Sequence, residues 1–182
     1  MAINSFINAI DRFNTWIGKA ASFIVYIMTG ILCFELFSRG IFNSPTVWAH
    51  ELTGYFFGAY FMLGGAYTLL EDGHVKVDII SSRFSERTKS IVDVITSLLI
   101  LMFHFILLWF STSLMITQIK RNEVSQTIFA PPVFPLSMVI VIGSIMFIFQ
   151  AIAKLIRGSI FLIRGKYIDP QKHTTSKDIE AV

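Results

Sequence analysis

The segment EDGHVKVDII, residues 71–80, places five ionisable side chains within eight positions: Glu71, Asp72, His74, Lys76 and Asp78. Carboxylates and a neutral imidazole are competent metal ligands. However, Gly73 predicts a turn, and the alternation with valines spreads the polar side chains along an extended edge. Lys76 in the middle would repel a cation. The pattern therefore favours a polar turn over a catalytic or metal site.

Histidines raise the alternative of haem ligation, which needs two axial ligands at similar depth. His50 and His74 are 24 positions apart, which is about 36 Å along a helix, so they cannot share one iron. His104 lies deep in an apolar run and is a functional candidate for that reason. A neutral imidazole bonded to a serine or threonine of a neighbouring helix accounts for it equally well. We expect no cofactor and no metal in this chain.

The composition indicates a membrane protein. The chain has 54% hydrophobic residues, 18 Phe and 15% charged residues, whereas soluble domains have about 25% charged residues. The net charge of +3 comes from scattered Lys and Arg without interleaved aromatics, so we expect no nucleic-acid partner. The single cysteine, Cys33, lies in an apolar run and is predicted to be a small core residue.

Four apolar stretches are long enough to cross a bilayer as helices. They cover residues 17–37, 48–70, 92–116 and 133–156. The sequence thus predicts an all-α integral membrane protein with four transmembrane helices in one domain, residues 1–166, followed by a polar, disordered tail, residues 167–182. These spans contain no polar path such as a channel requires, so we do not expect the chain to carry solute alone.

Charge asymmetry predicts the orientation, because short loops rich in Lys and Arg stay in the cytoplasm. The N-terminus, the second loop and the C-terminal part hold twelve such residues, and the opposite side holds three, Arg39, Lys120 and Arg121. Both termini are therefore predicted to be cytoplasmic. Residues 3–17 have apolar residues at helical spacing and suit an amphipathic helix lying along the headgroups. Residues 78–93 suit either such an interfacial segment or an extension of the third span.

The second span contains a packing pattern, Gly54, Gly58 and Gly65, which returns nearly to one helical face. Small residues at this spacing let helices approach closely in lipid, within the chain or at a subunit interface. At the entry to the span, Arg39 and Glu51 suit either an ion pair or independent extension to water.

Residues 34–80, FELFSRGIFNSPTVWAHELTGYFFGAYFMLGGAYTLLEDGHVKVDII, resemble the small membrane subunit of tripartite ATP-independent periplasmic (TRAP) transporters, the DctQ-like family. That pattern has an Arg after the first span, a Trp and a Glu opening the second, a Gly-rich end, and then Gly-x-His-x-x-x-Asp. The matching positions are Arg39, Trp48, Glu51, Gly64, Gly65, His74 and Asp78. The loop EVSQTIFAPPVFP, residues 123–135, resembles one branch of the family.

The resemblance implies a non-enzymatic subunit of a sodium-driven uptake system for organic acids in the bacterial inner membrane. A periplasmic protein captures the substrate, a large multispan subunit moves it and holds the sodium ions, and the small subunit braces the large one. The non-cytoplasmic residues Arg39, Lys120, Arg121 and Glu123 are then candidates for contact with the substrate-binding protein. The alternatives are a membrane-anchor or electron-transfer subunit of a redox complex and a freestanding membrane enzyme.

Overall fold

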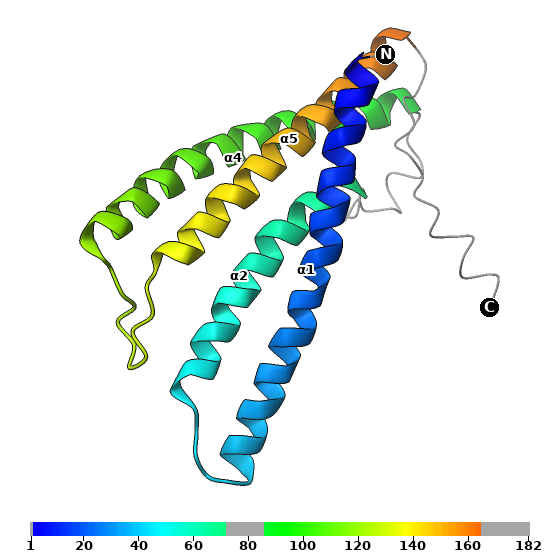
Figure 1. Cartoon of the computed structure of the whole chain (residues 1–182). Coiled ribbons are helices and arrows are strands. Elements are labelled where there is room, and N and C mark those ends of the chain that lie inside the picture. Colours follow the sequence, from blue (N-terminus) through cyan, green and yellow to red (C-terminus); the bar gives the residue numbers. More distant parts are fainter. Residues whose placement is uncertain (1, 72–85, 165–182) are drawn as a thin grey trace, which may run out of the picture.

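The computed structural model describes residues 2–71 and 86–164, and these form four long helices (Figure 1). The helices are α1 (Ala2–Gly40), α2 (Val47–Leu70), α4 (Glu86–Arg121) and α5 (Phe134–Arg164). The first three contain the predicted stretches 17–37, 48–70 and 92–116, and α5 begins one residue after the start of the stretch 133–156. The polar turn with His74 and Asp78, and the tail from residue 167, lie outside the described residues.

The helices form an open layer in the spatial order α4, α5, α2, α1, with each helix packed along the next (Figure 1). α1 also crosses α5 near the N-terminal end of α1 and the C-terminal end of α5. The α1–α2 loop and the α4–α5 loop lie at the opposite end of the layer, where the Tyr55 hydroxyl donates to the Pro132 carbonyl over 2.8 Å. The start of α1 and the end of α5 therefore share one end of the molecule.

Among the described residues, three helices are long and apolar enough to cross a membrane. They are Ile7–Gly40, Arg87–Arg121 and Phe134–Ile163. α2 has 24 residues, about 36 Å, which exceeds a hydrocarbon core of about 30 Å. α2 is not among these three, and it carries glycines, tyrosines and threonines between its apolar residues. The fourth span remains a prediction.

The predicted N-terminal interfacial helix is not a separate element. α1 runs unbroken through 39 residues, about 58 Å, because neither Gly nor Pro interrupts residues 3–17. Its polar residues Asp11 and Asn14 are buried by contact with α5, and do not face outward to headgroups. Of the second predicted segment, residues 86–93 form the first turns of α4, as the extension of a span would require.

Glycines permit close approach at each of the three contacts in the layer. At the contacts the glycines face these side chains: Gly18 faces Tyr67, Gly58 faces Leu136, Gly65 faces Phe147, Gly143 faces Met62, and Gly158 faces Val94. A Cβ at any of these five positions would lie under 3.0 Å from its neighbour. The layer therefore depends on backbone-level proximity at every contact.

The prediction that Cys33 is a core residue is wrong, because its side chain is exposed. The buried stripe of α1 follows Ile7, Asp11, Asn14 and Ala21 at steps of three, four and seven residues. Cys33 lies off this stripe, on the outer face of a helix that touches its neighbours along one side. An apolar sequence context therefore does not imply burial inside the protein.

Candidate functional site: polar contacts between the helices

The buried residues of α4 are all polar within its described part, although the helix is very apolar overall. Five of them recur at intervals of seven: Ser90, Ser97, His104, Ser111 and Gln118. Asp93 is also buried. In contrast, Phe103, Phe105 and Trp109 on the same helix point outward. A seven-residue repeat keeps one face toward a partner helix over its whole length.

α5 has a matching series of small buried residues, also at intervals of seven: Ser137, Ser144, Ala151 and Gly158. The two series run antiparallel, and their ends are fixed by contacts. The Ser137 hydroxyl donates to Gln118 Oε1 over 2.7 Å, and a Cβ on Gly158 would lie 2.9 Å from Val94. We call this contact the α4–α5 seam. The seven-residue spacing is present in the sequence and is the signal that could have located this contact.

His104 occupies the middle of the α4–α5 seam. Its Nδ1 lies 3.0 Å from the carbonyl oxygen of Ile100 in its own helix. Its ring stacks on Phe147 of α5 with centroids 4.1 Å apart. His104 thus joins the polar seam to the small apolar core that contains Phe147, Ala66 and Ala151.

A second polar group lies where α1 crosses α5. Asn14 Nδ2 donates to Gln150 Oε1 over 2.6 Å, and Gln150 Nε2 donates to Asp11 Oδ1 over 3.2 Å. The other carboxylate oxygen of Asp11 pairs with the Arg157 guanidinium, and the two side chains are 10% and 11% exposed. We call Asp11, Asn14, Gln150 and Arg157 the crossing cluster. One turn away on α5, Lys154 lies 3.6 Å from Asp93 of α4.

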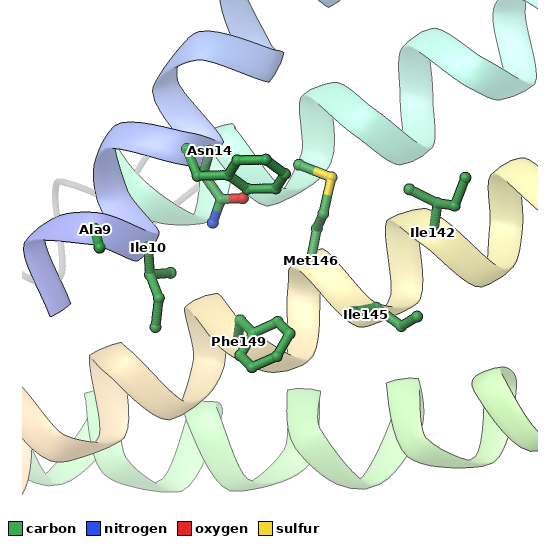
Figure 2. Close-up of a pocket in the computed structure, with 8 residues that line it drawn as sticks. Ala9, Ile10, Asn14, Ile142, Ile145, Met146 and Phe149 are labelled. Carbon is green, nitrogen blue, oxygen red and sulfur yellow. The ribbon is translucent and has the colours of Figure 1, made fainter. Parts of the chain in front are cut away.

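A groove of about 460 Å³ opens between α1 and α5 beside the crossing cluster (Figure 2). Its walls are almost entirely apolar, with Ile10 and Phe13 from α1 and Ile142, Ile145 and Phe149 from α5. Asn14 contributes the polar side chain of this lining, and it already donates to Gln150. The groove offers van der Waals contact and no arrangement of reactive groups.

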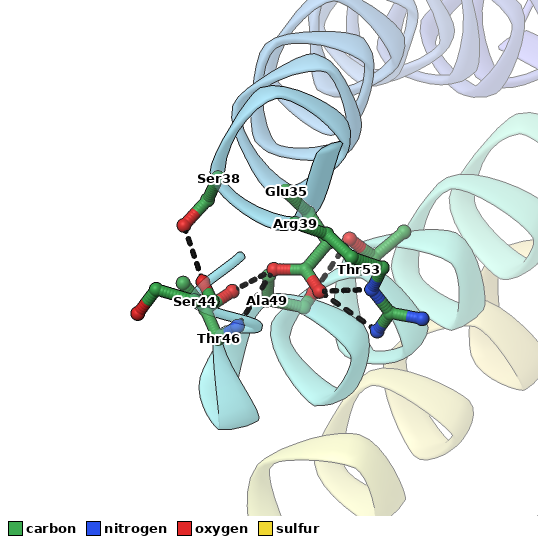
Figure 3. Close-up of polar contacts among 7 residues, drawn as sticks. All are labelled: Glu35, Ser38, Arg39, Ser44, Thr46, Ala49 and Thr53. Atoms are coloured by element: carbon green, nitrogen blue, oxygen red, sulfur yellow. Dashed lines mark hydrogen bonds and ion pairs between the residues drawn. The ribbon is translucent and has the colours of Figure 1, made fainter. Parts of the chain in front are cut away.

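At the other end of the layer, Glu35 closes the α1–α2 hairpin (Figure 3). Its Oε1 accepts bonds from Arg39 Nε and Nη2 at 3.2 and 2.9 Å, and its Oε2 accepts from the Thr46 backbone N–H at 3.0 Å and from the Thr46 hydroxyl. Thr46 is the N-cap residue of α2 and makes no side-chain cap bond of its own. The Glu35 carboxylate thus supplies an acceptor at the start of α2, where a negative charge is favourable.

The Arg39–Glu51 pair, one of the two predicted alternatives, does not form. Arg39 instead pairs with Glu35, four residues earlier on its own helix, where the two side chains are neighbours on one face. Glu51 is half-buried, and its Oε2 has no hydrogen-bond partner within residues 2–71 and 86–164. The i, i+4 spacing of Glu35 and Arg39 was readable in the sequence.

The structure does not gather the described signature residues into one site. Trp48 stacks on Phe34 near the α1–α2 loop, with centroids 5.8 Å apart. Gly65 lies against Phe147 further along α2, and a Cβ added to Gly64 would lie 4.0 Å from the Tyr60 ring. Of the predicted packing glycines, Gly58 and Gly65 face α5, whereas Gly54 has open space around it.

The four residues predicted to meet a substrate-binding protein all lie at the loop end of the layer. Arg39 has 68% of its side chain exposed. Arg121 lies 3.6 Å from Glu123, and Lys120 is exposed beside them. Of the four, Glu123 lies in the α4–α5 loop, which contains a β-bridge between Val124 and Pro132. These charges make the loop end of the layer polar and accessible.

The described residues contain no group of three or more His, Cys, Asp and Glu side chains that could hold a metal ion. Their buried charges are used in pairs between helices, Asp11 with Arg157 and Asp93 with Lys154. Each of these pairs joins two different helices of the layer, α1 with α5 and α4 with α5. The polar groups thus act in helix assembly.

Polar contacts inside and apolar side chains outside define the class as a helical integral membrane protein. A family model described as "Tripartite ATP-independent periplasmic transporters, DctQ component" matches residues 28–160. The chain belongs to this family and is a TRAP transporter component. It is also 26% identical over 101 residues to the "Sialic acid TRAP transporter permease protein SiaT" of Haemophilus influenzae (strain 86-028NP). The match takes in 56% of this chain and 16% of that relative's length.

Proposed function

We propose that this chain is the small permease subunit of a sodium-coupled TRAP transporter, where it scaffolds a large transport subunit for uptake of an organic acid. The observation that carries the proposal is the family match across residues 28–160, which includes most of the helical layer. The name of the similar permease supports an acidic substrate, since sialic acid is a carboxylic acid.

A division of labour between subunits follows from two observations. The matched stretch is 16% of a protein named as a permease, so the counterpart of this chain works beside a much larger remainder. The ion pairs Asp11–Arg157 and Asp93–Lys154 are engaged between helices of the layer. We therefore place the solute path and the sodium sites in a large multispan partner.

In this proposal all four helices span the bacterial inner membrane, with both termini in the cytoplasm. The start of α1 and the end of α5 lie at one end of the layer, which supports termini on a common side. The charge asymmetry of the loops assigns that side to the cytoplasm. A reporter fused to the C-terminus that is active only in the cytoplasm, such as a fluorescent protein, should be active, and an active periplasmic reporter there would reverse the orientation.

The loop end then faces the periplasm and the substrate-binding protein. Arg39, Lys120, Arg121 and Glu123 are our candidates for that contact. Reversing Lys120 and Arg121 together to Glu should weaken docking of the substrate-binding protein on the assembled transporter and leave that protein's own affinity for its ligand unchanged. Arg12→Glu, an exposed charge at the other end of the layer, is the matched control and should leave docking intact.

The test of the whole proposal is reconstitution in liposomes with an imposed sodium gradient. The three components together should accumulate the organic acid, and omission of this chain should abolish or strongly reduce uptake. The chain alone should show none. Uptake by this chain alone, or full uptake without it, would overturn the scaffold role.

A further inference from the structure

The crossing of α1 over α5 is held by polar bonds. α1 packs along α2 for most of its length and meets α5 over a short stretch. Within that stretch the crossing cluster connects Asp11 and Asn14 of α1 with Gln150 and Arg157 of α5. Gln150 and Arg157 are seven residues apart, so they share one face of α5.

The crossing cluster joins α5 to α1 and not to α4. Lys154, between Gln150 and Arg157 in sequence, faces away toward Asp93 of α4. α5 therefore uses one polar face for α1 and another for α4. The first face connects the α1–α2 hairpin with the α4–α5 hairpin, whereas the second acts inside the α4–α5 hairpin.

Physical chemistry gives such a cluster a particular role. Helices in lipid gain little from apolar contact with one another, since the lipid is equally apolar. A buried ion pair adds little stability over an apolar pair of similar volume, but it penalises every arrangement in which one charge is left unpaired. The crossing cluster therefore selects one crossing position of α1 on α5 from many apolar alternatives of similar energy.

We infer that Asp11 and Arg157, supported by Gln150 and Asn14, are positioning residues that set where α1 crosses α5. They act beside the α2–α5 contact, through which the two hairpins also meet. The groove of Figure 2 depends on this crossing, because its walls are α1 and α5 side chains on the two sides of Asn14. Arg157 contacts Asp11 through Nη2, and its buried Nε has no hydrogen-bond partner among the described residues. Since one nitrogen of the guanidinium makes this contact, we expect a lysine ammonium to replace it.

The test measures the distance between spin labels on α1 and α5 in the full chain in nanodiscs. Labels are placed at Trp16→Cys and Ile163→Cys, both exposed positions, in a Cys33→Ser background that removes the natural cysteine. The parent chain should give one narrow distance distribution. Arg157→Lys, which keeps the charge, should give the same distribution.

Two variants decide the inference. Asp11→Asn leaves Arg157 buried without its counter-charge, and the narrow distance should be lost. Asp11→Leu combined with Arg157→Met replaces the pair by apolar side chains, and this chain should still fold but give a broad distribution. Lys154→Met is the matched control on the same helix, and it should keep the narrow distance because it acts on α4.

A narrow, unshifted distance in Asp11→Asn or in the apolar double variant would overturn the inference. Failure of the apolar double variant to fold would also overturn it, since the pair would then supply stability and not position. If Asp11→Asn does not accumulate in the membrane, the apolar double variant decides alone. The measurement uses this chain by itself, so its outcome is independent of the proposed transport role.

Discussion

Gly18→Ala should destabilise the chain by separating α1 from α2. A Cβ at Gly18 would lie 2.5 Å from the Cβ of Tyr67, whereas non-bonded carbons rest at about 3.5–4.0 Å. The Tyr67 Cβ is attached to the backbone of α2, so no side-chain rotation can relieve the overlap. The two helices must move apart by about 1 Å, and overpacking of this kind costs about 1–3 kcal/mol.

Gly30→Ala is the matched control on the same helix, because no atom of the described part of the chain lies within 4 Å of its added Cβ. Both substitutions gain about 1 kcal/mol of helix propensity, so the difference between the two variants measures the packing cost alone. Each kcal/mol shifts the melting temperature of a chain of this size by about 2–4 °C. In identical detergent micelles, Gly18→Ala should melt about 2–12 °C below Gly30→Ala. Equal melting temperatures would refute the close contact of α1 and α2 at this position.

Three further predictions concern single contacts. His104→Ala should lower the free energy of unfolding by about 2–4 kcal/mol, because it empties the middle of the α4–α5 seam. His104→Phe keeps the stacked ring and should lower it by less than about 1.5 kcal/mol. Equal melting temperatures of the two variants would contradict the stacking. Tyr55→Phe removes the bond to the Pro132 carbonyl, worth about 0.5–1.5 kcal/mol, and should speed amide hydrogen exchange in residues 122–133; unchanged rates there would show that the bond does not order the loop. Glu35→Ala removes the acceptor of the Thr46 amide and should speed exchange at that amide, with Glu123→Ala as a control that leaves it slow.

The helices themselves could be predicted from the sequence, because long apolar runs in lipid must be helical. The first helix is longer than its predicted span, because the amphipathic pattern of residues 3–17 predicts a separate interfacial helix and the structure has one continuous helix, α1. Polar residues such as Asp11 and Asn14 among apolar ones would show the same pattern whether they faced lipid headgroups or packed against α5. Sequence periodicity shows that a helix has a polar face, but it does not show which partner covers that face.

The sequence also contains a signal for the contact between α4 and α5. Ser90, Ser97, His104, Ser111 and Gln118 repeat every seven residues, which predicts a continuous contact with a partner helix. The pairing of Asp11 with Arg157 was not readable, since the residues are 146 positions apart and other pairings satisfy the same charges. The spatial order α4, α5, α2, α1 was equally hidden, because apolar faces in lipid carry no preference for one neighbour over another.

The helices bury polar side chains between them and expose apolar ones, the reverse of a water-soluble protein. This arrangement connects the fold with the proposed scaffold role. In water, Phe103, Phe105, Trp109 and Phe110 on one exposed face would form a large apolar patch that invites aggregation. In a bilayer the same face is compatible with lipid and also with an apolar partner helix. The α4–α5 seam and the crossing cluster hold the helices together through buried side chains. The exposed apolar face of α4 is therefore not needed for folding. A layer built this way can exchange lipid for a large membrane subunit along its surface while its own helix contacts stay unchanged.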